Sequence, residues 1–273
     1  MMNKTLKTRM TVGAGAIDSP LNFLAGQKIS FQDENIRLKS LCAFSVAEVL
    51  IVLVIIGVIC AFLIPAIKLR VEEKVLVSKY KKLYSMLNST YNESIRRYGS
   101  PQYWDLEGDI GFLSVNFVKY LVPAGLKGEY IEDEELVLGG KWLHNKNKKE
   151  FDFLGTPIYR LPDGTLFMNI WVTNAKCKFQ VEDKNNLYLK ELCGDMRVDL
   201  NGEKGPNTYG VDQFRFRISK RGIIPIGIRD DIDRPVKDYC NPKVGGEFNG
   251  YSCGAWILEK ETMPWLYGKQ IDW

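Results

Sequence analysis

One carboxylate, Glu48, lies at the start of a long apolar stretch, where burying an unpaired charge costs at least about 2 to 3 kcal/mol in a bilayer. The nineteen residues from 49 to 67 that follow it carry no charge. Glu48 can stay solvated at headgroup level, or it can pair with a positive group on a neighbouring copy of the chain. An amino terminus created at Phe44 would be such a group, about one helical turn away when helices stack with a stagger. The second interpretation makes Glu48 an assembly residue.

A second group of oxygen-bearing side chains lies with glycines between residues 199 and 212. Its members are Asp199, Asn201, Asn207 and Asp212. Such oxygens suit calcium, and these four are the calcium candidates. The spacing nevertheless lacks the glycine and the closing glutamate of an EF-hand loop. The alternative is two consecutive turns, made by Asn201-Gly202 and by Gly205-Pro206-Asn207.

Cysteine is the third residue type that could do chemistry, with six in the chain. Cys42 and Cys60 lie before and within the apolar stretch. The disulfide candidates are Cys177, Cys193, Cys240 and Cys253. Pairing in sequence order would close two short loops, although four cysteines allow three connectivities. Disulfides indicate an oxidising compartment. Zinc is the competing interpretation, but C-x-x-C spacing is missing and the only histidine, His144, is distant.

Catalytic patterns are missing from the sequence. His144 has no serine or cysteine motif near it, and no G-x-S-x-G, P-loop or dinucleotide fingerprint occurs. We expect the acidic run 132–135 to be a solvated surface segment. We therefore expect no enzyme activity, no catalytic residue and no cofactor, apart from the calcium candidates above.

Composition limits the class of protein. The chain has 273 residues, 45% hydrophobic and 26% charged, with a net charge of +4. These values exclude a disordered chain, a collagen-like repeat and a multi-span transporter. Residues 1–43 hold six Lys/Arg and three Asp/Glu, so the remaining body is nearly neutral. A neutral body lacks the basic surface that nucleic acid requires, and we expect no nucleic-acid partner.

The elements that position these residues are one long helix and a sheet. Nineteen uncharged residues at about 1.5 Å each approach the ~30 Å of a bilayer core. Beyond them, an apolar stripe at helical spacing runs from Leu76 to Ile95, and Gly99-Ser100-Pro101 ends it. The predicted segments are a leader at 1–43, a transmembrane helix at 44–67, its amphipathic continuation at 68–98 and an antiparallel β-rich domain at 99–273.

Short alternating runs separated by turns predict the antiparallel sheet. The clearest hairpin joins 156–161 to 165–172 through Pro162-Asp163-Gly164. Residues 212–219 alternate with period two, which directs Phe214, Phe216 and Ile218 inward. The alternation directs Arg215 and Arg217 outward, to a solvated face. The predicted fold class is α+β, with a long N-terminal helix packed on a C-terminal antiparallel sheet.

The segment Ala43-Phe44-Ser45-Val46-Ala47-Glu48-Val49-Leu50-Ile51, continuing through Gly57 to Pro65, resembles the class III signal of type IV pilins and type II secretion pseudopilins. The resemblance covers residues 39 to 70. It implies a pilin-like fold, prepilin peptidase cleavage between Ala43 and Phe44, N-methylation of Phe44 and filament assembly through Glu48. The chain departs from the family pattern in having Ala43 where glycine is usual, and in the length of its leader.

The resemblance also implies a function and a location. The chain is expected to be a structural subunit of a type II secretion pseudopilus or a type IV pilus-like filament. Its partners would be prepilin peptidase, other pilin or pseudopilin subunits and an inner-membrane assembly platform. It would cross the bacterial inner membrane once, with the globular domain in the periplasm or outside the cell. Some pseudopilins bind calcium, and many pilins have a disulfide-bounded C-terminal region like that at Cys240 and Cys253.

Two other functions remain open. The chain could be a single-span, membrane-anchored extracytoplasmic binding domain that never polymerises, in which Glu48 is incidental. It could also be an anchored hydrolase that depends on His144. Processing at Phe44 distinguishes the filament subunit from the plain anchor, and loss of an activity on His144→Ala would indicate the hydrolase.

Overall fold

The computed structural model describes residues 45–106, 116–131, 138–144, 151–155, 159–174, 176–181 and 185–273. These residues are divided between two units, one that ends at Val54 and one that begins at Ile55. The helices are α1 (Val46–Tyr98), α2 (Asn116–Leu121), α3 (Leu187–Lys190), α4 (Val236–Tyr239) and α5 (Cys253–Lys260). The strands are β1 (Glu129–Tyr130), β2 (Leu138–Gly140), β3 (Phe151–Gly155), β4 (Tyr159–Arg160), β5 (Leu166–Val172), β6 (Leu192–Asp199), β7 (Gln213–Ser219) and β8 (Gly222–Pro225). Short 3₁₀ turns lie at Pro101–Tyr103 and Pro264–Tyr267.

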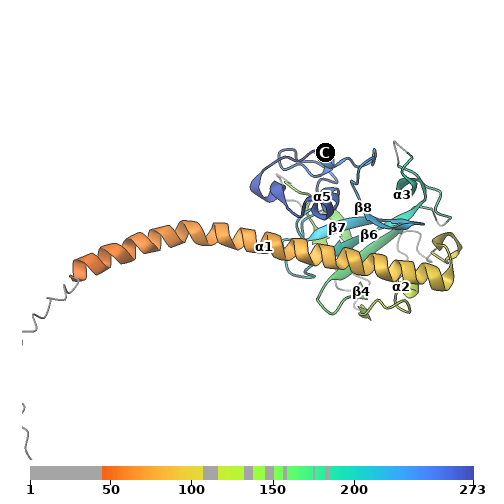
Figure 1. Ribbon diagram of the computed structural model, residues 1–273, viewed down its shortest axis with the longest axis horizontal. Helices are drawn as coiled ribbons and strands as arrows, with labels where there is room; N and C mark the ends of the chain where they lie inside the picture. Colours follow the sequence, from red (N-terminus) through yellow and green to blue (C-terminus); the bar gives the residue numbers. More distant parts are fainter. Residues whose placement is uncertain are drawn as a thin grey trace, which may run out of the picture. The chain divides into compact units, whose positions relative to one another are not determined.

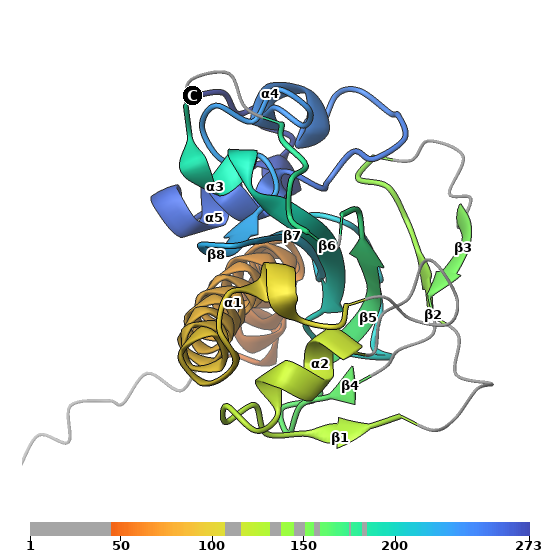
Figure 2. The same cartoon turned by 90° about the vertical axis from the view of Figure 1, so that its right-hand side faces the viewer.

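The fold class is α+β, as predicted. Six strands form one antiparallel sheet in the order β1-β4-β5-β6-β7-β8, and β2 pairs with β3 in a separate two-stranded sheet. The hairpin predicted around Pro162-Asp163-Gly164 is confirmed, because β4 and β5 pair on either side of that turn. Figure 2 shows α1 on one side of the curved six-stranded sheet and the β2–β3 hairpin on the other.

Helix α1 continues unbroken through Pro65 and ends where the sequence predicts. Gly99 follows the last helical residue with φ +78°, and its N–H donates to the Ile95 carbonyl at 2.9 Å. Glycine suits this left-handed position because it has no Cβ. The buried residues of α1 are Val77, Tyr80, Leu83, Leu87, Thr90, Tyr91 and Ser94. Their three- and four-residue spacing makes one stripe that packs on the sheet (Figure 1).

The main core lies between this stripe and β7. Phe214, Phe216 and Ile218 are buried, which confirms the predicted inward face. The ring of Tyr80 lies 4.5 Å from the Phe214 ring and 5.4 Å from the Phe216 ring, centroid to centroid. Each fully buried side chain of this size contributes about 1.5 to 3 kcal/mol. Tyr91 adds a polar anchor, since its hydroxyl donates to the Ser219 carbonyl at 2.6 Å.

The predicted solvated face at Arg215 and Arg217 is wrong. Arg217 is only 5% exposed, and its guanidinium contacts both carboxylate oxygens of the fully buried Asp231 at 3.1 Å. Arg215 lies over the ring of Tyr251, 4.7 Å from its centroid, and donates to its hydroxyl at 2.8 Å. The chain after β8 covers this face of the sheet. The alternation within β7 predicts which side chains share a face of the sheet. It does not predict that the chain after β8 covers that face.

Candidate functional site

The first turn of α1 is built around Ser45 and Glu48. The Ser45 N–H donates to Oε2 of Glu48 at 2.7 Å, and the Glu48 N–H donates to Oγ of Ser45 at 3.2 Å. This reciprocal pair is a capping box, which satisfies two N–H groups at the helix start. Sequence reasoning identified Glu48 and missed Ser45. The signal was present, because Ser-x-x-Glu before an apolar run is the sequence pattern of this cap.

The apolar segment after this cap is exposed along its whole length. Every residue from 45 to 68 is exposed, including large side chains such as Leu53 (58%) and Phe62 (77%). Among the described residues, one helix, α1, is long and apolar enough to cross a membrane. The predicted cleavage and methylation positions, Ala43 and Phe44, and the rest of the leader lie outside the described residues.

Two disulfides tie together segments of the globular unit, residues 69–273, which follows the exposed apolar segment of α1. Cys177 pairs with Cys193 in β6, and Cys240 at the end of α4 pairs with Cys253 at the start of α5. The structure therefore selects the sequential pairing among the three connectivities. Cys60, in the apolar part of α1, is a free, exposed thiol.

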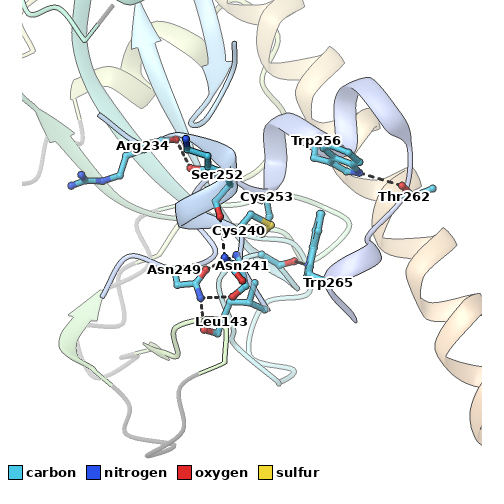
Figure 3. The surroundings of a disulfide bond; sticks show 12 residues. Leu143, Arg234, Cys240, Asn241, Asn249, Ser252, Cys253, Trp256, Thr262 and Trp265 are labelled. Atoms are coloured by element: carbon cyan, nitrogen blue, oxygen red, sulfur yellow. Dashed lines mark hydrogen bonds between the residues drawn. A yellow bond between two sulfur atoms is a disulfide. The ribbon is translucent and has the colours of Figure 1, made fainter. Parts of the chain in front are cut away.

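The loop closed by the second disulfide is held from inside by Asn249 (Figure 3). Its amide nitrogen donates to the carbonyls of Leu143 at 3.0 Å, Asn241 at 2.8 Å and Val244 at 2.6 Å. Its oxygen accepts from the Asn241 N–H at 3.0 Å. A single buried side chain thus joins this loop to the segment after β2.

The calcium candidates converge at the β6–β7 connection. Oδ1 of Asp199 accepts from the Asn201 N–H at 3.0 Å. The two carboxylate oxygens of Asp212 accept from the N–H groups of Asn207 at 2.9 Å and Thr208 at 2.7 Å. Both carboxylates are fully buried. These hydrogen bonds stabilise the two turns that the sequence predicts. The calcium candidates and the turn residues therefore lie in the same loop.

The charge at this loop is poorly compensated. Burial, together with repulsion from Asp212, raises the pKa of Asp199 to about 7. Burial also raises the pKa of Asp212, against the opposing effect of the N–H groups of Thr208 and Asn207. Asp199 has one side-chain donor nearby, because Nε2 of Gln213 lies 3.0 Å from its Oδ2. A proton or a cation at these carboxylates would relieve the repulsion.

Three buried amide oxygens near these carboxylates find no hydrogen-bond partner among the described residues: Oδ1 of Asn201, Oδ1 of Asn207 and Oε1 of Gln213. Gln213 was not among the sequence candidates, and only the pairing of β6 with β7 places it opposite Asp199. Carboxylate and amide oxygens are the donors that calcium takes. Within the described part of the chain, no three His, Cys, Asp or Glu side chains group as metal ligands, so amide oxygens would have to complete a site. Calcium binding stays a prediction.

His144 lies exposed in a turn after β2, with a left-handed backbone (φ 54°). This placement gives no argument for the hydrolase, and the expectation that the chain is not an enzyme stays a prediction. Comparisons with family models, with curated proteins and with solved structures found no match to this chain. The assignment of function therefore depends on the residues and contacts described above.

Proposed function

We propose that this chain is a prepilin-like structural subunit of a type II secretion pseudopilus or a type IV pilus-like filament. Prepilin peptidase would cut before Phe44 and methylate the new amino group. The subunit would wait in the bacterial inner membrane, crossing it once, with its globular unit on the outer side. An assembly platform would then bring it together with other subunits, whose helices stack with its own.

The observation that carries this proposal is the exposed apolar segment of α1 with a single carboxylate at its capped start. No described residue from 45 to 68 is buried. A contiguous apolar surface of this size is unfavourable in water and marks contact with lipid or with other proteins. Lipid can cover it before assembly, and the helices of neighbouring copies can cover it afterwards. Within residues 45 to 67, Glu48 is the one charged side chain, and it must find a partner in either environment.

The disulfides of the globular unit support a location outside the cytosol, and the packing of its sheet shows that the unit buries its own core. Its four cysteines form two disulfides, and such bonds persist in oxidising compartments. Its sheet is covered on one face by the amphipathic part of α1 and on the other by the chain that carries Asp231 and Tyr251. The unit thus buries its own core and needs no membrane, unlike the segment that precedes it.

N-terminal processing tests the proposal directly. The full chain is co-expressed with an active prepilin peptidase, and the membrane fraction is analysed by N-terminal mass spectrometry. We expect a mature chain that begins at N-methylated Phe44, and an uncut chain with a catalytically inactive peptidase. An intact leader beside the active enzyme would refute the proposal and favour the single-span anchored binding domain.

A further inference from the structure

A hollow of about 510 Å³ lies beside α1, just past the end of its exposed apolar segment. On one side it is lined by α1 residues between Glu73 and Lys81, among them Ser78. On the other side it is lined by Glu261 and Thr262, in the connection that follows α5. A volume of this size is ordinary for a site that takes a small ligand.

The carboxylates that line the hollow already have partners. One oxygen of Glu73 accepts from the Met263 N–H and the other from the Tyr267 hydroxyl, each at 2.7 Å. The carboxylate of Glu261 pairs with Lys81. Both acids are therefore engaged within the globular unit, and their negative charges do not compensate the remaining cations of the hollow.

The remaining cations are Lys74, which lines the hollow, and Arg70. They are four residues apart, so they lie on the same side of α1, and both are exposed. Within the part of the chain that the structure describes, neither forms an ion pair with a carboxylate, whereas Lys68 lies 3.7 Å from Glu72. This side of α1 thus presents positive charge that suits an anion.

The same side of α1 is apolar before these cations. Leu63 and Ile67 precede Arg70 and Lys74 at alternating spacings of four and three residues, so the four side chains follow one line along the helix. Leu63 is 52% exposed and Ile67 is 58% exposed. An anion bound at the hollow would therefore lie at the end of an exposed apolar track.

The spacing along α1 matches the layers of a bilayer. At 1.5 Å per residue, Lys74 lies about 10 Å beyond Ile67 and Arg70 about 5 Å beyond it. The headgroup layer that flanks the hydrocarbon core is about 5 to 8 Å thick. When the apolar segment spans a membrane, Arg70 lies among the headgroups, and Lys74 reaches them with its flexible stem.

We propose that this hollow binds the headgroup of an anionic phospholipid, with its phosphate at Arg70 and Lys74 and its acyl chains along Ile67 and Leu63. A soluble anion would use the two cations and leave the apolar track uncovered, which is why we assign a lipid. The bound lipid would hold the globular unit at the membrane surface. The inference needs α1 to cross a membrane, and it needs neither cleavage nor filament assembly.

Lipid selectivity of the purified full chain tests this binding. The protein is kept in an uncharged detergent, phosphatidylglycerol and phosphatidylcholine are added in equal amounts, and native mass spectrometry measures the ratio of the two bound lipids. Lys74→Gln should lower the preference for phosphatidylglycerol about fivefold, and adding Arg70→Gln should lower it about 25-fold, from the usual contribution of each basic side chain. Lys237→Gln combined with Lys243→Gln changes the charge equally at exposed sites outside α1 and should keep the wild-type ratio.

A second pair of variants fills the hollow without changing its charge. Ser78 is exposed and lines the hollow, so the indole of Ser78→Trp should occupy it and abolish the preference for phosphatidylglycerol. Ser85 is exposed on the same helix, two turns further on, and is not a lining residue. Ser85→Trp is therefore the matched control and should bind lipid as wild type does.

A wild-type lipid ratio in either Ser78→Trp or the Arg70/Lys74 double variant would overturn the inference. Displacement of the lipid by glycerol 3-phosphate would also overturn it, because the site would then be one for free anions. Variants that keep the wild-type ratio but enter filaments less would show that the hollow receives an acidic segment of an adjacent copy instead. An uncut chain beside active peptidase would refute the proposed function and leave the lipid site standing.

A measurement in bilayers complements the detergent experiment. The wild-type chain is placed in phosphatidylcholine nanodiscs with and without phosphatidylglycerol, and the rate at which an amine reagent acylates each lysine is followed by peptide mapping. Lys74 should react more slowly when phosphatidylglycerol is present, and Lys237 should react equally in both discs. Equal rates for Lys74 in the two discs would show that no anionic headgroup covers it, contrary to the inference.

Discussion

The side chain of Asn88 in α1 pairs with the backbone of Ile223 in the edge strand β8. Its Nδ2 donates to the Ile223 carbonyl at 2.9 Å, and the Ile223 N–H donates to its Oδ1 at 3.0 Å. The carboxamide thus makes the two bonds that a neighbouring strand would make. Two residues further on, Pro225 has no N–H to offer. Helix α1 therefore closes this edge of the sheet, where an open edge favours pairing with other chains.

Replacing Asn88 with alanine should weaken the globular unit. The change leaves a backbone N–H and carbonyl of Ile223 without partners, which costs about 1 to 3 kcal/mol of unfolding free energy. Urea unfolding of the full chain in detergent, followed by near-ultraviolet circular dichroism, measures this loss. Asn92→Ala on the exposed side of the same helix is the matched control and should be nearly neutral. Equal stability of the two variants would refute the role of Asn88.

The two disulfides should make the globular unit sensitive to reductant. Each closes a short loop, with separations of 16 and 13 residues, and loops of this size contribute about 3 kcal/mol by restricting the unfolded chain. A thermal scan with and without dithiothreitol should show a lower melting temperature in the reduced protein. Cys60→Ser serves as the control and should leave the scan unchanged, because this thiol is free.

Thiol labelling checks the connectivity independently. Before reduction, an alkylating reagent should modify Cys60, with none of the four paired cysteines labelled. Peptide mapping should then recover Cys177 linked to Cys193, and Cys240 linked to Cys253. Any crossed peptide would contradict the structure.

Stability should fall as the pH rises from about 4 to about 7, because Asp199 keeps its proton in the folded protein and loses it in the unfolded chain. Its pKa of about 7 in the folded protein lies above its ordinary value of 3.8, so between these values the folded state binds more protons than the unfolded state. The contribution is fully present below pH 4 and is lost as the pH passes 7, and it amounts to at most about 4 kcal/mol. Urea unfolding across this pH range measures it. Asp199→Asn should flatten the dependence, whereas Asp105→Asn at an exposed site should not.

Calcium should bind to the same carboxylate oxygens that take up the proton at low pH. At pH 8, where Asp199 is ionised, millimolar calcium should raise the melting temperature of the full chain, and a chelator should reverse the change. At pH 5 a proton occupies the same oxygens, so the effect should be smaller. Asp212→Asn should remove the calcium response. An unchanged melting temperature at pH 8, together with no heat of binding in calorimetry, would exclude the calcium site.

The substitution Glu48→Ala should block assembly into filaments without affecting folding. The residue lies outside the globular unit, so the variant should fold and insert into membranes as wild type does, yet fail to enter filaments. Glu72→Ala is the control on the same helix, because Glu72 is an exposed carboxylate paired with Lys68. Filament fractions analysed by immunoblot give the result. Normal incorporation of Glu48→Ala would remove its assembly role.

The sequence by itself determined what depends on neighbours along the chain. The helix period from Leu76 to Ile95 and the stop at Gly99 predicted α1 and its end. The alternation at Phe214 and Phe216 predicted the inward face of β7. These signals are local, because helical and extended backbones repeat over a few residues and burial selects side chains with the same period.

Tertiary structure decided what depends on residues far apart. The cover over Arg217 comes from Asp231, the closure of the sheet edge comes from Asn88, and the place of Gln213 beside Asp199 comes from strand pairing. The choice among three cysteine connectivities belongs to the same class. No local period records such contacts, since they form only when the packing of α1 and the loops on the sheet brings distant segments within hydrogen-bond reach.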